Sequence, residues 1–195
     1  IAVPSLNHAS YLNEALESLF SQDLPIEVFV ADGGSSDGSL SIITNWENKL
    51  AGWRSYPDQG QSAAVNEGIA RGTAPYVCWL NSDDRLLPGG LAILLQSLME
   101  HPEASAAYGR VWNEGVGSKR RPIITAPFSP ALLAQFCIIS QPGTLIRRTA
   151  WETVGGLDVN LHMAMDYDLW WKLNNNVGPL IYNKKFVAVN RDHAT

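Results

Sequence analysis

The sequence predicts a single α/β domain with a mostly parallel central sheet flanked by helices. Short apolar segments typical of buried strands, at residues 26–31 and 75–80, and a further strand candidate at 53–56 alternate with segments of helical periodicity. Strands separated by helices in this way form βαβ units, in which the strands run parallel. The length of 195 residues fits one domain, and 46% hydrophobic against 17% charged residues indicates a globular chain.

Three segments have the apolar spacing of amphipathic helices. In residues 11–20, Leu12, Leu16 and Leu19 lie three or four positions apart and therefore share one helix face. Similar segments occupy residues 42–50 and 91–98, and we expect a further helix at residues 63–70. They complete the alternation of strand and helix through the first half of the chain.

The second half is less regular. We expect strands at residues 105–112, 144–147 and 180–189, and a helix at 166–173. A polar loop at 113–127 carries a basic cluster of Lys119, Arg120 and Arg121. The chain is therefore interpreted as one domain with a regular half, residues 1–112, and an irregular half, residues 113–195.

Composition excludes several classes of protein. The net charge is −5, from 14 Lys and Arg against 19 Asp and Glu, which argues against a nucleic-acid binder. Cys78 and Cys137 have no CxxC spacing, so we expect a reducing, cytoplasmic environment. No stretch approaches the roughly 20 apolar residues that span a bilayer. The chain starts in what reads as a strand and ends without a terminal signal, so we expect a segment of a longer protein.

Polar residues follow three of the predicted strands, where α/β sheets bind ligands. We expect Asp32, at the end of residues 26–31, to contact a ligand, and Asp37 to cap the next helix. Asp58 opens a second polar tip. Asp83 and Asp84 end an apolar strand, where a divalent cation would relieve their repulsion; the alternative is a solvated pair in a loop. The chain has neither a GxGxxG nor a GxxxxGK[ST] motif.

A series of blocks, in sequence order, resembles the family 2 glycosyltransferases. The opening Pro4-Ser5-Leu6-Asn7 is followed by DGGSSDGS from Asp32, DQGQSAAVNEGIARG from Asp58 and LNSDD ending at Asp84. QPGT at 141–144, GGLD at 155–158 and MDYDLW at 165–170 resemble the later blocks. These later blocks look most like those of bacterial O-antigen and surface-polysaccharide enzymes.

The resemblance implies a GT-A fold, a nucleotide-diphosphate sugar donor, with UDP favoured, and Mg²⁺ or Mn²⁺ as cofactor. Residues 1–112 would then bind the donor and 113–195 the acceptor. By position, Asp84 would hold the metal, with His193 as a second candidate ligand, and Asp166 would be the catalytic base. The implied donor-binding residues are Pro4, Ser5, Asn7, Asp32, Gly33, Asp58, Gln61, Ser62, Asn81 and Asp83. On the acceptor side they are Gln141, Gly143, His162 and Trp171.

The implied reaction is inverting transfer of a sugar to a hydroxyl of a glycan or lipid-linked acceptor in cell-surface polysaccharide synthesis. The basic cluster at 119–121 would suit the inner face of a membrane. Two departures from the family pattern stand out: Gly33 and Met165 occupy positions where the family often has an acid. One alternative is therefore an inactive nucleotide-sugar-binding or regulatory module. Another is a sugar-nucleotide pyrophosphorylase, although residues 4–7 lack the Gly-rich basic loop such an enzyme needs.

Overall fold

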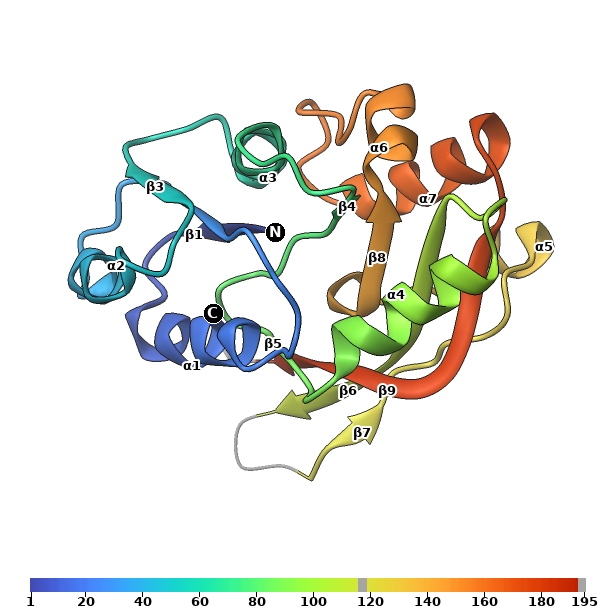
Figure 1. Ribbon diagram of the computed structural model, residues 1–195, viewed down its shortest axis with the longest axis horizontal. Helices are drawn as coiled ribbons and strands as arrows, with labels where there is room; N and C mark the ends of the chain where they lie inside the picture. The colour runs from blue at the N-terminus through green and yellow to red at the C-terminus, as the bar shows by residue number, and fades with distance from the viewer. Residues whose placement is uncertain (116–118, 193–195) are drawn as a thin grey trace.

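The computed structural model describes residues 1–115 and 119–192, which form two sheets with helices packed on their faces (Figure 1). The first sheet is parallel, in the order β1-β2-β3. Its strands are β1 (Ala2–Ser5), β2 (Phe29–Asp32) and β3 (Gly52–Ser55). The helices of this half are α1 (Ala9–Phe20), α2 (Ser39–Trp46) and α3 (Gln61–Ala70). Ser5, Asp32 and Ser55 are in register, so the three strands end at one edge.

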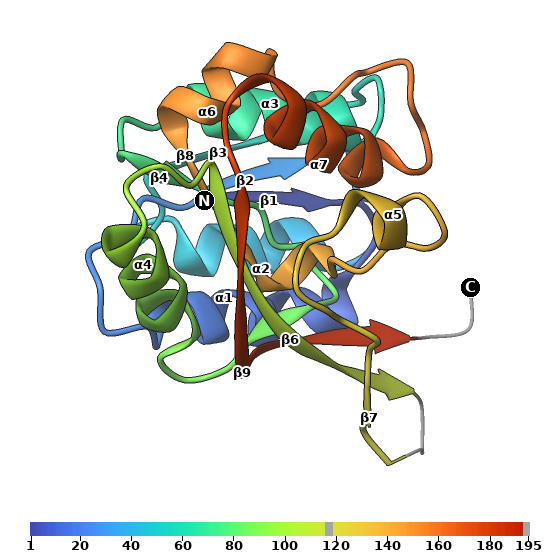
Figure 2. The same ribbon diagram turned by 90° about the vertical axis from the view of Figure 1, so that its right-hand side faces the viewer.

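The second sheet has six strands, in the order β4-β8-β6-β9-β5, with β7 paired to β6. The strands are β4 (Tyr76–Val77), β5 (Arg85–Leu86), β6 (Ala106–Gly115), β7 (Arg121–Pro122), β8 (Thr144–Arg147) and β9 (Leu180–Asp192). Its helical segments are α4 (Gly90–Glu100), α5 (Pro130–Leu133), the 3₁₀ turn η1 (Gln141–Gly143), α6 (Arg148–Val154) and α7 (Met165–Asn176). Figure 2 shows the long strands β6 and β9 running side by side.

The segment after β4 joins the two sheets. The Ala2 N–H donates to the Cys78 carbonyl at 3.1 Å, and the Leu80 N–H donates to the Ala2 carbonyl at 3.0 Å. Ala2 and Trp79 therefore form a parallel bridge. Through this bridge, the residues that follow β4 come to the same edge as the ends of β1, β2 and β3.

The α/β class predicted from the sequence is confirmed, with a more mixed sheet than expected. The strands β1–β3 pair in parallel, as do β6 and β9, whereas β4, β5, β7 and β8 pair antiparallel. Every predicted helix is present with shifted ends. The sequence did not indicate β5, β7, α5 or α6, because two-residue strands and helices of four or seven residues are too short to show a clear periodicity.

The buried hydrophobic residues form two main clusters, one that includes α1 and one that includes α7. The predicted stripe of α1 is buried, with Leu12, Leu16 and Leu19 fully inaccessible to solvent. A second cluster contains Trp79 and Trp170, whose stacked rings lie 6.2 Å apart between centroids, so Trp170 packs in the core. No helix in the described part of the chain is long and apolar enough to cross a membrane.

The packing of α3 against β1 leaves no room for a side chain at Gly68. A Cβ there would lie 2.7 Å from the Cβ of Ala2. In a helix interior, alanine is more stabilising than glycine by about 1 kcal/mol. Overpacking a core, however, costs about 1–3 kcal/mol of stability. We expect Gly68→Ala to lower the free energy of unfolding in urea. The double variant Ala2→Gly/Gly68→Ala should recover part of that loss, whereas a Gly68→Ala protein more stable than wild type would contradict this packing.

Candidate active site

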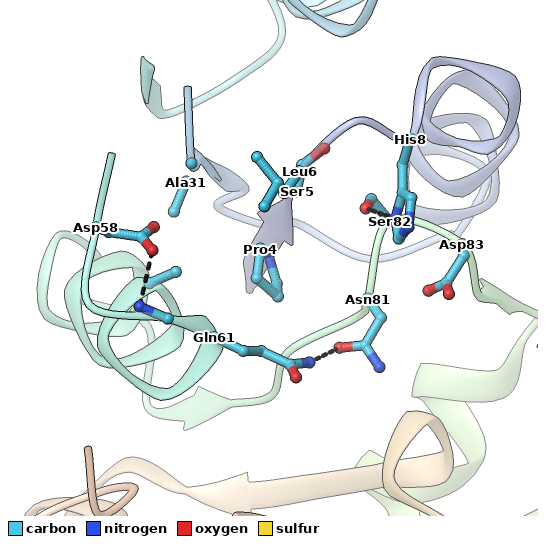
Figure 3. Close-up of a pocket in the computed structure, with 13 residues that line it drawn as sticks. Pro4, Ser5, Leu6, His8, Ala31, Asp58, Gln61, Asn81, Ser82 and Asp83 are labelled. Atoms are coloured by element: carbon cyan, nitrogen blue, oxygen red, sulfur yellow. Dashed lines mark hydrogen bonds between the residues drawn. The ribbon is translucent and has the colours of Figure 1, made fainter. Parts of the chain in front are cut away.

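A first cavity of about 370 Å³ opens at the shared edge of the strands (Figure 3). It is lined by Pro4, Ser5, Leu6, His8, Ala31, Gly33, Asp58, Gly60, Gln61, Ala64, Asn81, Ser82 and Asp83. Seven of the ten residues expected on the donor side are among them. The exceptions are Asn7, Asp32 and Ser62. Parallel strands carry their polar tips to one place, and this is why residues from four segments meet here.

Asp32 is fully buried and does not line the cavity. Its carboxylate accepts hydrogen bonds from the backbone N–H groups of Gly34 and Ser35, at 3.1 and 2.9 Å, and from the hydroxyls of Ser35 and Ser55. These donors lie in the loop after β2 and at the end of β3. In this structure Asp32 therefore holds the loop in shape, and Gly33 beside it faces the cavity.

Asn7 and Ser62 also bind backbone groups of the loops around the site and do not line the first cavity. The side-chain oxygen of Asn7 accepts the backbone N–H of Ser36 at 2.9 Å, which joins the loops after β1 and β2. The hydroxyl of Ser62 is buried and lies 3.3 Å from the carbonyl of Leu161, to which it donates. This contact ties α3 to the loop before α7.

Asp58 is positioned by a buried arginine that the sequence analysis did not single out. The Arg54 guanidinium donates to the Asp58 carboxylate at 2.8 Å and to Glu67 at 3.1 Å. It also donates to the Asp32 and Tyr56 carbonyls. These partners bury the Arg54 side chain, whereas the Asp58 side chain is more exposed and lines the cavity. Arg54 directly follows Trp53 in the strand predicted at residues 53–56, and this position gave no signal that its side chain would be buried.

The acid pair ending LNSDD divides between cavity and core. Asp83 lines the first cavity, whereas Asp84 is buried and accepts hydrogen bonds from the Arg191 backbone N–H at 2.9 Å and from the Asn81 amide at 3.4 Å. Burial, and then the charge of Asp83, raise the pKa of Asp84 to about 7. Neither acid points into bulk solvent away from the site. His193 lies outside the described residues.

His8 is a cavity residue that the sequence analysis left without a role. Figure 3 shows its ring beside Ser82 and Asp83, with Nδ1 2.7 Å from the Ser82 hydroxyl. Within the described chain, no Lys or Arg lines this cavity, so His8 is the basic side chain in the lining. Its place depends on the start of α1 meeting the turn before β5, a contact across 74 residues.

A second cavity of about 250 Å³ adjoins the first. It is lined by Gln61, Trp79, Asn81, Gln141, His162, Met163, Ala164, Met165 and Asp166. Gln61 and Asn81 belong to both cavities, and the amide of Gln61 donates to the Asn81 side-chain oxygen at 2.6 Å between them (Figure 3). Asp166 lies in the first turn of α7, and burial raises the pKa of its carboxyl. Asp83 and Asp166 thus line two adjoining cavities, whereas Asp84 lines neither of them.

Two of the four residues expected on the acceptor side, Gln141 and His162, line this second cavity. Gly143 is buried instead; a Cβ there would lie 2.6 Å from a methyl group of Val111. Trp171 packs edge-on against Tyr167 and does not line either cavity. The sequence analysis did not select Trp79 or the Met163–Met165 loop, because apolar residues at these positions read as core.

The comparisons with known proteins agree with this geometry. A family model described as glycosyl transferase family 2 matches residues 1–155. The chain belongs to this family. Chondroitin synthase of Pasteurella multocida is 25% identical over 200 residues, a match that covers 94% of this chain and 20% of that protein. The chain thus spans about a fifth of the length of that relative.

Two solved structures have the same fold. TarS residues 1–349 from S. aureus, in complex with UDP-GlcNAc, matches with a TM-score of 0.80 at 20% identity, over 99% of this chain and 58% of that one. The mannosyltransferase PcManGT from Pyrobaculum calidifontis, in complex with GDP-Man and Mn²⁺, gives 0.74 at 22% identity, over 96% and 55%. The GT-A fold and the glycosyltransferase class are confirmed, and the pyrophosphorylase alternative is set aside.

The role of Asp32 can be separated from ligand binding. Asp32→Asn removes a charged acceptor from several donors, so we expect the free energy of unfolding to fall by about 2 kcal/mol. Urea denaturation measures this change. Retained stability together with lost nucleotide affinity would show instead that Asp32 contacts the ligand directly.

Asp84 gives stability a pH dependence of defined sign. Its carboxyl has a pKa of about 7 when folded, against about 3.9 in an unfolded chain. The folded state holds a proton that the unfolded state releases, so stability falls as pH rises between these values, by up to about 1.4 kcal/mol per pH unit. Urea unfolding of the metal-free protein at about pH 5 and about pH 7 measures this loss. Asp84→Asn should remove the part of this pH dependence that Asp84 causes and leave the part that Asp166 causes. If the variant's unfolding free energy changed with pH as steeply as that of the wild type, Asp84 would not be the source of this dependence.

Proposed function

We propose that this chain is a metal-dependent, inverting glycosyltransferase that moves a sugar from a nucleoside-diphosphate donor, with a UDP-sugar favoured, to a hydroxyl of a glycan or lipid-linked acceptor. The observation that carries the proposal is the pair of adjoining cavities, one with Asp58 and Asp83 and the other with Asp166. A transferase needs a donor and an acceptor side by side. Neighbours of the same fold bind UDP-GlcNAc and GDP-Man, which supports this arrangement.

A divalent cation fits the acid pair. The first cavity has two carboxylates in its lining and no Lys or Arg within the described chain, so a diphosphate entering it needs positive charge from elsewhere. Asp83 and Asp84 would hold the cation. The described residues contain no cluster of three or more potential ligands, and Mg²⁺ commonly takes one or two carboxylates together with substrate phosphates. When bound, such a cation stabilises the negative charge of the departing diphosphate.

Asp166 would act as the general base. It accepts the proton of the acceptor hydroxyl while that oxygen forms a bond to the anomeric carbon. The bond from this carbon to the diphosphate oxygen breaks, and its electron pair leaves with the nucleoside diphosphate. A single displacement of this kind inverts the anomeric configuration. Burial raises the pKa of Asp166, which makes its carboxylate a stronger base.

The setting that fits this activity is cell-surface polysaccharide synthesis. Chondroitin synthase is a polysaccharide-forming relative, and a glucosyltransferase from Campylobacter jejuni acting on an undecaprenol-linked glycan also matches this chain, at 30% identity over 105 residues. The exposed basic cluster of Lys119, Arg120 and Arg121, of which Arg120 pairs with Glu114 at 2.7 Å, would suit the inner face of a membrane that carries such an acceptor.

The base is tested by a matched pair of variants in α7. We expect Asp166→Asn to reduce sugar transfer at least about a hundredfold and to leave donor affinity near wild type. Asp168→Asn is the control, because Asp168 pairs with Lys172 at 2.6 Å and lines neither cavity. Product formation from UDP-sugars with Mn²⁺ and calorimetric donor binding supply the two measurements.

Two outcomes would contradict the proposal. Normal transfer by Asp166→Asn would reject its role as base. Nucleotide binding by the wild type without transfer or donor hydrolysis, with and without Mn²⁺, would favour the inactive binding module instead.

A further inference from the structure

His162 lies at the boundary between the two cavities. Its side chain is exposed and lines the second cavity. Its Nδ1 is also 3.9 Å from the position that a Cβ on Gly60 would take, and Gly60 lines the first cavity. The next residue, Gln61, belongs to both linings. The imidazole therefore lies against the segment at which the two cavities meet.

The start of α3 fixes the loop that carries His162. The Ser62 hydroxyl donates to the carbonyl of Leu161, the residue before His162, at 3.3 Å. One turn further along α3, the Asn66 side chain donates to the Leu157 carbonyl at 2.8 Å and accepts the Leu157 N–H at 3.0 Å. The loop is thus tied at two places to the helix whose first residues line the first cavity. His162 belongs to the second half of the chain, but contacts from the first half hold its backbone.

Gly60 leaves space beside the imidazole. Its φ of +102° and ψ of 179° form a combination that is essentially restricted to glycine. Any other residue at this position would be strained and would set its Cβ between the first cavity and His162. Because Gly60 has no side chain, the ring of His162 stays within reach of a group that extends out of the first cavity.

The transferred sugar has to occupy this boundary. In the proposed reaction its anomeric carbon is bonded to the diphosphate in the first cavity, and the attacking acceptor oxygen gives its proton to Asp166 in the second. The sugar ring therefore lies where the cavities adjoin, beside the hydrogen-bonded amides of Gln61 and Asn81 (Figure 3). A neutral imidazole at this boundary can donate from one ring nitrogen and accept at the other, and a sugar hydroxyl pairs with either.

We propose that His162 binds a hydroxyl of the transferred sugar while that sugar is still bonded to the diphosphate. This inference rests on the proposed function and assigns His162 to recognition of the donor sugar, whereas the family resemblance implied the acceptor side. His162 does not line the first cavity, which the nucleotide fills. It therefore contributes to the binding of a nucleotide sugar and not to the binding of the free nucleotide.

The test compares each nucleotide sugar with its own free nucleotide. Calorimetry in the presence of Mn²⁺ measures the Kd of UDP-glucose, UDP-galactose, UDP-GlcNAc and GDP-mannose, and that of UDP and GDP. For the nucleotide sugar that the wild type binds, we expect His162→Ala to raise the Kd roughly fivefold to tenfold, the loss of one hydrogen bond. The Kd of the matching nucleotide should stay unchanged. His162→Asn keeps a hydrogen-bonding group near the position of Nδ1 and should recover part of the loss.

His101→Ala is the matched control, because His101 is a partly exposed histidine that pairs with Glu103 at 3.3 Å and lines neither cavity. All its Kd values should equal those of the wild type. Since the His162 side chain is exposed, its replacement leaves the core intact, and urea unfolding of the variants verifies this.

Three results would count against these assignments. An equal loss of affinity for nucleotide and nucleotide sugar in His162→Ala would overturn the inference, because the imidazole would then contact the nucleotide. An unchanged Kd for the nucleotide sugar would also overturn it and would leave the proposed function standing. A wild type that binds none of these nucleotide sugars would reject the proposed function itself.

Discussion

The buried carboxylate of Asp84 joins the last strand to the turn that borders the first cavity. It accepts the backbone N–H of Arg191, 107 residues away, and the amide of Asn81 on its own turn. The Arg191 guanidinium pairs in turn with Glu14 on α1, at 2.5 Å. Through Arg191, the turn that carries Asp83 is therefore fixed to both β9 and α1. The geometry of the site thus depends on the pairing of β9.

This clamp has an energetic cost that links stability to function. Burial and the neighbouring charge of Asp83 disfavour ionised Asp84, and two N–H donors offset only part of that effect. The proposed cation would offset more of it and would also supply the charge that the first cavity lacks. A destabilised acid pair at the centre of a site is typical of groups kept for chemistry rather than for folding.

The hydrogen bond from Gln61 to Asn81 explains how one site can have two compartments. Gln61 begins α3 in the regular half of the chain, and Asn81 follows the strand that links the two sheets. One compartment is built mainly from strand ends of the first sheet. The other takes its walls from η1 and the loop before α7, so under the proposed function donor and acceptor recognition could vary separately.

The sequence by itself determined the alternation of strands and helices, the buried face of α1 and the polar tips that carry Asp58 and Asp83. These features depend on local periodicity and on the rule that parallel strands end together, whereas Asp166 was indicated only by the resemblance to the family. Only the tertiary structure decided that Asp32 turns inward while His8 lines the first cavity. It also decided that Trp79 and Gln141 share the second cavity. Each of these placements depends on contacts between segments far apart in the chain, and local pattern has no information about which of several polar or aromatic residues such contacts will cover.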